Sequence, residues 1–96
     1  MFIHCFAFRW KDGTTEAQKE QAAHEIRALQ GQIPGLLETL VGVNTSPRGR
    51  GYEFGGVMRF TSRAAFIFYN DHPAHEQLLT WLLPIIDPLE LDFEIP

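Results

Sequence analysis

The chain has 96 residues, 45% hydrophobic and 21% charged, so we expect one domain spanning residues 1–96 around one hydrophobic core. A net charge of −4 argues against nucleic acid as a partner. No apolar run approaches the roughly 20 residues of a membrane-spanning helix, so no membrane partner is expected. The single cysteine, Cys5, rules out an internal disulfide.

Residues 2–10 alternate between two faces and predict a strand. One face is the heavier, and it carries Phe2, His4, Phe6, Phe8 and Trp10. Because the segment has no basic leader and is strand-like from the start, it does not resemble a signal peptide. We therefore expect a cytoplasmic protein.

A helix is predicted over about 16–31, because Thr15 and Gln18 form a capping-box pattern and Pro34-Gly35 ends the periodicity. Its apolar stripe is Ala22, Ile26, Leu29 and Ile33. Residues 36–44 predict a second strand. We expect one of its faces to hold Leu36, Leu40 and Gly42, and the other to hold Leu37, Thr39, Val41 and Val43.

A loop rich in turn formers leads to a third predicted strand at about 52–60. Ser62 then caps a short helix that ends near Tyr69. A further helix begins at Pro73 and runs to about Ile86, where Asp87-Pro88 ends it. The final strand alternates Leu89, Leu91, Phe93 and Ile95 with Glu90, Asp92 and Glu94.

This order is β-α-β-β-α-β, so the predicted fold class is α+β, a ferredoxin-like sandwich with helices on one face of an antiparallel sheet. The heavier strand faces should meet the helices, which places His4, Phe54 and Met58 inside. The opposite face has no helix to cover it, yet it is largely apolar, with Ile3, Cys5, Ala7 and Val57. An uncovered apolar sheet face indicates a partner surface, and we expect a homodimer.

Residues 69–75 place a phenol, a carboxylate and two imidazoles around a helix start. Pro73 suits the first helical position, so the N-cap is Asp71 or His72, and His75 falls in the first turn. The positive end of the helix dipole disfavours protonation there. A neutral His75 can accept a proton near pH 7, while Tyr69 can donate to a developing enolate oxygen.

Each candidate also has a structural interpretation. Tyr69 and His4 could be core residues whose polar atoms are satisfied internally. His75 could cap the helix start or bond a backbone carbonyl, and His72 could pack or cap. A zinc site would need His72 and His75 to converge with Asp71 or His4, and nothing in the sequence fixes such a third ligand, so no metal is expected.

With these elements in place, the chain resembles the stress-responsive A/B barrel (Dabb) family over nearly its whole length. The matching segments are His4 in an aromatic first strand, Phe8 to Gly13, Ile33-Pro-Gly35, residues 44–52, Tyr69 to His75, and Leu91 to Glu94. The resemblance implies a dimeric α+β barrel. It also implies a comparison with a plant polyketide cyclase of this family, which makes olivetolic acid by a cofactor-free aldol cyclisation.

Carried over by that resemblance, Tyr69 and His75 are the catalytic candidates and His4 lines their pocket. The cyclase has a further pocket histidine where this chain has Phe54. The resemblance and the strand pattern together predict a pocket whose ligand-binding residues are His4, Phe6, Phe54, Met58 and His72.

We therefore expect a homodimer whose function is to bind a carbonyl-containing ligand in a small apolar pocket. Cofactor-free proton transfer is the favoured chemistry. Two alternatives remain open: a non-enzymatic ligand-binding or stress-associated protein, and a cofactor-free monooxygenase like other dimeric α+β barrels.

Overall fold

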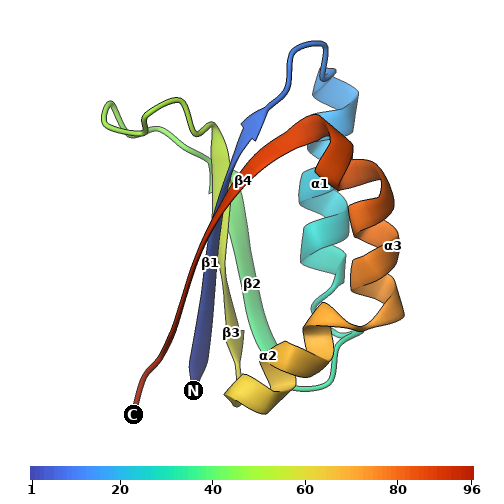
Figure 1. Cartoon of the computed structure of the whole chain (residues 1–96), viewed down its shortest axis with the longest axis vertical. Coiled ribbons are helices and arrows are strands. Elements are labelled where there is room, and N and C mark those ends of the chain that lie inside the picture. Colours follow the sequence, from blue (N-terminus) through green and yellow to red (C-terminus); the bar gives the residue numbers. More distant parts are fainter.

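In the computed structural model, which describes residues 1–96, four strands form one antiparallel sheet in the order β2-β3-β1-β4. The elements in chain order are β1 (Phe2–Trp10), α1 (Glu16–Ala28), β2 (Leu36–Val43), β3 (Phe54–Phe60), α2 (Arg63–Asn70), α3 (Pro73–Leu82), a 3-10 turn (Leu83–Ile85) and β4 (Ile86–Glu94). Figure 1 shows α1 and α3 on the same face of the sheet, with the other face bare. The predicted ferredoxin-like fold is confirmed.

The core lies between the sheet and the helices, and the heavier faces of β1 and β3 form its floor. The buried side chains from these two strands on this side are Phe2, His4, Phe6, Phe8, Phe54, Met58 and Phe60. The buried stripe of α1, including Ala22 and Ile26, packs above them. The prediction that His4, Phe54 and Met58 face the helices is confirmed.

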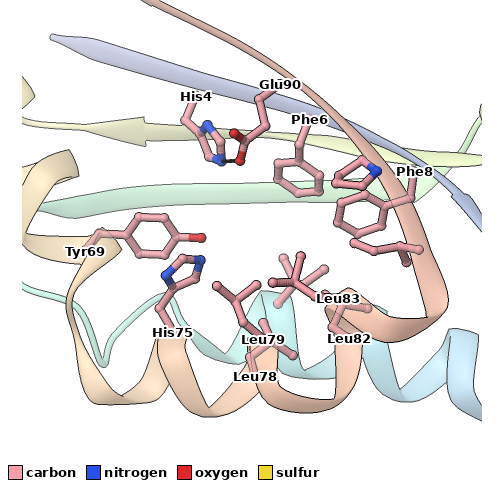
Figure 2. A pocket seen from close by; sticks show the side chains of 13 residues that line it. His4, Phe6, Phe8, Tyr69, His75, Leu78, Leu79, Leu82, Leu83 and Glu90 are labelled. Carbon is pink, nitrogen blue, oxygen red and sulfur yellow. Dashed lines mark ion pairs between the residues drawn. The ribbon is translucent and has the colours of Figure 1, made fainter.

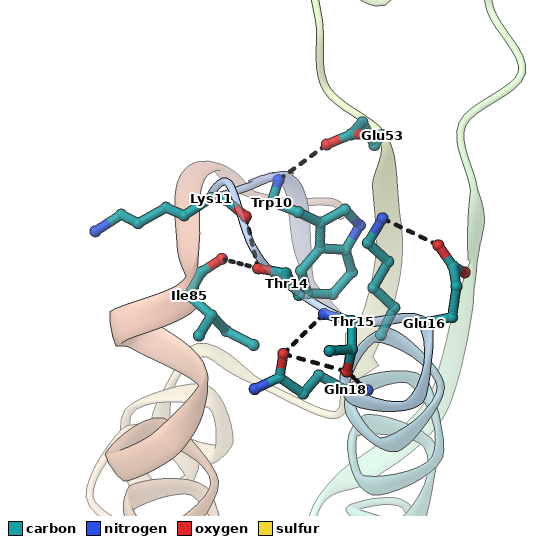
Figure 3. Close-up of polar contacts among 9 residues, drawn as sticks. Trp10, Lys11, Thr14, Thr15, Glu16, Gln18, Glu53 and Ile85 are labelled. Carbon is teal, nitrogen blue, oxygen red and sulfur yellow. Dashed lines mark hydrogen bonds and ion pairs between the residues drawn. The ribbon is translucent and has the colours of Figure 1, made fainter.

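The predicted capping box at the start of α1 is present (Figure 3). The backbone N–H of Gln18 donates to Thr15 Oγ1 at 3.1 Å, and Gln18 Oε1 accepts from the Thr15 N–H at 2.8 Å. One residue earlier, the Thr14 hydroxyl donates to the Lys11 carbonyl at 2.7 Å. These bonds fix the turn that leads from β1 into α1.

The chain breaks between α2 and α3 as the Pro73 pattern predicts. His72 is extended, with φ −69° and ψ 136°, and is the N-cap of α3, with Pro73 as the first helical residue. A residue before proline avoids the helical region, so α2 cannot continue into α3. His75 consequently lies in the first turn of α3.

Three details differ from the sequence prediction. A β-bulge between Leu36 and Glu38 shifts the register of β2, so Thr39 faces the helices opposite Met58 while Leu40 lies on the bare face. A one-residue insertion reverses every later side chain, which is why Leu36 and Leu40 do not share a face.

Helix α3 also ends at Leu82, before the 3-10 turn, and β4 already begins at Ile86 and includes Asp87 and Pro88. Pro88 is tolerated because β4 is an edge strand.

The bare face of the sheet is apolar across its strands. Register pairs on this face join Leu40 to Val57, Val57 to Cys5, and Cys5 to Leu91. A neighbouring row joins Ile3 to Phe93. Leu40, Leu91 and Phe93 are 57%, 64% and 44% exposed. On β4, Leu89, Leu91 and Phe93 therefore point away from the helices. None of the helices combines the length and apolarity needed to cross a lipid bilayer.

Candidate functional site

A cavity of about 190 Å³ opens between the helices and the β1–β4 half of the sheet (Figure 2). It is lined by His4, Phe6 and Phe8 of β1, Ile26 of α1, Tyr69 of α2, His75, Leu78, Leu79 and Leu82 of α3, Leu83, and Ile86, Pro88 and Glu90 of β4. Its polar groups gather at one end, where His4, Tyr69, His75 and Glu90 lie, and the remaining wall is apolar.

Tyr69 reaches this cavity from the last turn of α2. Its ring packs against Phe60, with centroids 5.2 Å apart, and against the His75 ring at 4.2 Å. The residue is only 4% exposed, and its hydroxyl points into the cavity (Figure 2). That hydroxyl forms no hydrogen bond with another protein group. Burial, with the Glu90 and Asp92 carboxylates adding to it, raises the pKa of Tyr69, so the phenol is a neutral O–H donor at physiological pH.

His75 is oriented by the break between the two helices. Its Nδ1–H donates to the Asn70 carbonyl oxygen at 3.1 Å, satisfying a carbonyl at the end of α2. This bond leaves Nε2 as the free acceptor of the neutral ring. Burial is the main cause that lowers the pKa of His75 below its usual value, which favours this neutral form.

His4 lies at the same end of the cavity, buried between β3 and β4. Its Nδ1 forms a 2.5 Å hydrogen bond with Asp92 Oδ1, and its Nε2 lies 4.0 Å from Glu90 Oε1. The His4 and Tyr69 ring centroids are 6.1 Å apart. The Asp92 carboxylate therefore fixes the orientation of the His4 ring, as carboxylates commonly do for functional imidazoles.

The structure brings four of the sequence candidates together and leaves three outside. His4, Phe6, Tyr69 and His75 line the cavity. Phe54 and Met58 are buried deeper in the core, where Phe54 packs beside Trp10 at a centroid distance of 5.7 Å. His72 turns away, because its Nδ1 accepts the Ala74 N–H at 3.1 Å as the N-cap.

The pocket residues predicted from the sequence do not include Glu90 or most of the apolar wall. The helical spacing of His75, Leu78 and Leu82 is a signal for that part of the wall, since residues three and four apart share a face. Glu90 gives no such signal. It becomes visible only from the pairing of β4 with β1, which sets Glu90 opposite Phe6 and Asp92 opposite His4.

The fold and this cavity define an α+β ferredoxin-like protein with a small, mostly apolar pocket. The chain belongs to the Stress responsive A/B Barrel Domain family, Dabb, whose family model matches residues 2–95. A comparison with curated protein sequences gives no match.

Solved structures agree on the fold. A dimeric ferredoxin-like protein of unknown function from Thermobifida fusca is 28% identical with a TM-score of 0.85, covering 98% of this chain and 90% of its own. A Dabb family protein from Mesorhizobium loti is 25% identical with a TM-score of 0.84, covering 99% and 96%. Hydroxynitrile lyase from Passiflora edulis has a TM-score of 0.90 at 21% identity, covering 99% and 93%, a likeness of fold alone.

Proposed function

We propose that the cavity catalyses cofactor-free proton transfer on a small carbonyl compound. One observation carries the proposal: the Tyr69 hydroxyl, which has no protein partner, and the free Nε2 of His75 open onto the same cavity from rings 4.2 Å apart. A donor and an acceptor at this spacing can act on two neighbouring atoms of one ligand.

The two groups divide the reaction between them. His75 Nε2 removes a proton from the carbon beside the carbonyl, and the C–H electron pair forms the enolate. Tyr69 O–H donates a hydrogen bond to the carbonyl oxygen, on which the negative charge develops. A raised pKa keeps Tyr69 protonated for this role, and a lowered pKa keeps His75 neutral for its own. Return of the proton to the same or another atom regenerates His75.

The cavity limits the size of the ligand. A dry cavity of about 150 Å³ accommodates benzene, so about 190 Å³ suits a ring or short chain that carries one carbonyl group. Phe6, Phe8 and the leucines of α3 would contact its apolar part. Hydroxynitrile lyase from Passiflora edulis indicates that an enzyme can be built on this fold.

We also propose that the protein is a homodimer joined through the bare sheet face. The Thermobifida fusca protein, which is 28% identical and shares this fold, is described as dimeric. On β4 the exposed Leu89, Leu91 and Phe93 point to the bare face, while Glu90 and Asp92 point to the helix side. An isolated domain would favour the reverse arrangement, because it would bury the apolar residues.

The test is deuterium uptake by acetophenone, a methyl ketone of suitable size, in buffered D₂O followed by NMR. The wild-type protein should accelerate exchange of the methyl protons over buffer. Tyr69→Phe and His75→Gln should each reduce the acceleration by at least about 100-fold, the usual size of a general acid–base contribution.

Matched controls come from the other tyrosine and an exposed histidine. Tyr52, which stacks under Arg9 at 4.4 Å, and His24, exposed on α1, lie outside the cavity. Tyr52→Phe and His24→Gln should therefore leave exchange unchanged. If acetophenone binds in the cavity but no variant alters its exchange rate, the catalytic proposal fails and a non-enzymatic ligand-binding function replaces it.

A further inference from the structure

Apart from the histidines, the charged groups around the cavity are carboxylates. Of the 13 lining residues, Glu90 is the only acidic or basic one apart from the two histidines, and no lysine or arginine is among them. Asp92 stands directly behind His4 and adds a second carboxylate. The ion pairs formed by lysine and arginine lie elsewhere, between Lys19 and Glu16 and between Arg59 and Glu38.

Glu90 is not explained by packing. It lies between Pro88 and Asp92 on the helix-facing side of β4, paired with Phe6, where an apolar side chain would extend the cavity wall. Its side chain is 64% exposed, and its carboxylate points across the polar end of the cavity toward His4 (Figure 2). A ligand whose polar group reaches Tyr69 and His75 therefore passes close to this carboxylate.

We propose that Glu90 determines the charge specificity of the cavity, admitting neutral carbonyl compounds and rejecting carboxylates or phosphates of the same size. This inference rests on the proposed function and names the substrate class of that site. The Tyr69 hydroxyl alone would not make this distinction, since a phenol donates to a carboxylate at least as well as to a ketone. Repulsion from Glu90, in a cavity lined by no lysine or arginine, supplies the discrimination.

The test compares acetophenone with benzoate, which has the same number of non-hydrogen atoms and a carboxylate in place of the methyl ketone. Binding is measured by NMR titration of the backbone amides at neutral pH and low salt. Wild-type protein should bind benzoate at least about tenfold more weakly than acetophenone, as expected for a like charge at a partly solvated site.

In Glu90→Gln, benzoate should bind more tightly, so that the gap between the benzoate and acetophenone affinities narrows to about threefold or less. The acetophenone affinity itself should change less than about twofold. Glu94→Gln is the matched control, because Glu94 lies on the same face of β4 but outside the cavity lining. It should retain the wild-type gap. Benzamide, which is neutral but shaped like benzoate, should bind like acetophenone in all three proteins.

Any of the following results would overturn the inference: equal binding of acetophenone and benzoate by the wild type, an unchanged affinity ratio in Glu90→Gln, or benzamide behaving like benzoate. Absence of acetophenone binding at millimolar concentration would overturn it as well. The proposed function fails separately, because its test is loss of proton exchange in Tyr69→Phe and His75→Gln. If the cavity selects ligands by charge but does not accelerate proton exchange, the role of Glu90 in specificity holds and the protein is a binding protein rather than an enzyme.

Discussion

Replacing Tyr69 by phenylalanine should separate function from stability. The phenyl ring would keep its packing against Phe60 and His75, at centroid distances of 5.2 and 4.2 Å in the wild type. The hydroxyl that disappears has no protein hydrogen-bond partner, so the usual net contribution of about 0.5–1.5 kcal/mol per hydrogen bond is not lost. We expect the free energy of unfolding to change by less than about 0.5 kcal/mol.

Urea denaturation followed by circular dichroism measures this change, with both proteins at one concentration so that subunit association contributes equally. In thermal unfolding the same limit corresponds to a melting-temperature shift of less than about 4 °C for a domain of this size. Tyr69→Ala, by contrast, should cost about 3–5 kcal/mol, because it empties a site that is 4% exposed.

A loss of more than about 1.5 kcal/mol in Tyr69→Phe would refute the reasoning. Such a loss would mean that the hydroxyl is hydrogen-bonded within the protein and is not free for a ligand. Unchanged stability together with lost proton exchange would instead assign the hydroxyl to chemistry.

Three further predictions follow from single features. The folded state lowers the pKa of His75, so near and below the ordinary histidine pKa of about 6.5 the unfolded chain binds more protons than the folded protein. The wild type should therefore lose stability relative to His75→Gln as the pH falls from about 7 toward 5. Identical pH profiles of the two proteins in urea denaturation would contradict this. Leu91→Asp, on the bare sheet face, should yield monomers in sedimentation velocity at micromolar concentration, whereas Ile67→Asp, an exposed apolar position on α2, should not; a dimeric Leu91→Asp would rule out that interface. Thr39→Val should stabilise the fold by about 1 kcal/mol in urea denaturation, because the buried Thr39 hydroxyl has no hydrogen-bond partner, and a loss of stability would show that the hydroxyl is satisfied.

Local signals in the sequence were enough to predict the element order. The aromatic alternation of β1, the capping box at Thr15 and the break at Pro73 each depend on residues close together in the chain, and all three are confirmed. The bulge after Leu36 was not predictable, because it depends on how β2 pairs with β3. The early end of α3 at Leu82 likewise reflects the pairing of Ile86 with Trp10, which draws the chain into β4.

The site was predictable to the extent that it follows one element at a time. Strand alternation placed His4 and Phe6 on the helix side, and Pro73 placed His75 in a first turn. Whether an inward-facing residue reaches a cavity or the close-packed core depends on how far α3 lies from each strand. For that reason Phe54 and Met58 fall in the core, while Leu83 and Glu90 line the cavity.

The most direct test of the central claim is a crystal structure of the protein with acetophenone bound. The account predicts the ketone oxygen within about 2.6–3.2 Å of the Tyr69 hydroxyl, with the methyl carbon about 3–3.5 Å from His75 Nε2. A ketone bound with its oxygen toward Leu83 and Pro88, at the apolar end of the cavity, would contradict it.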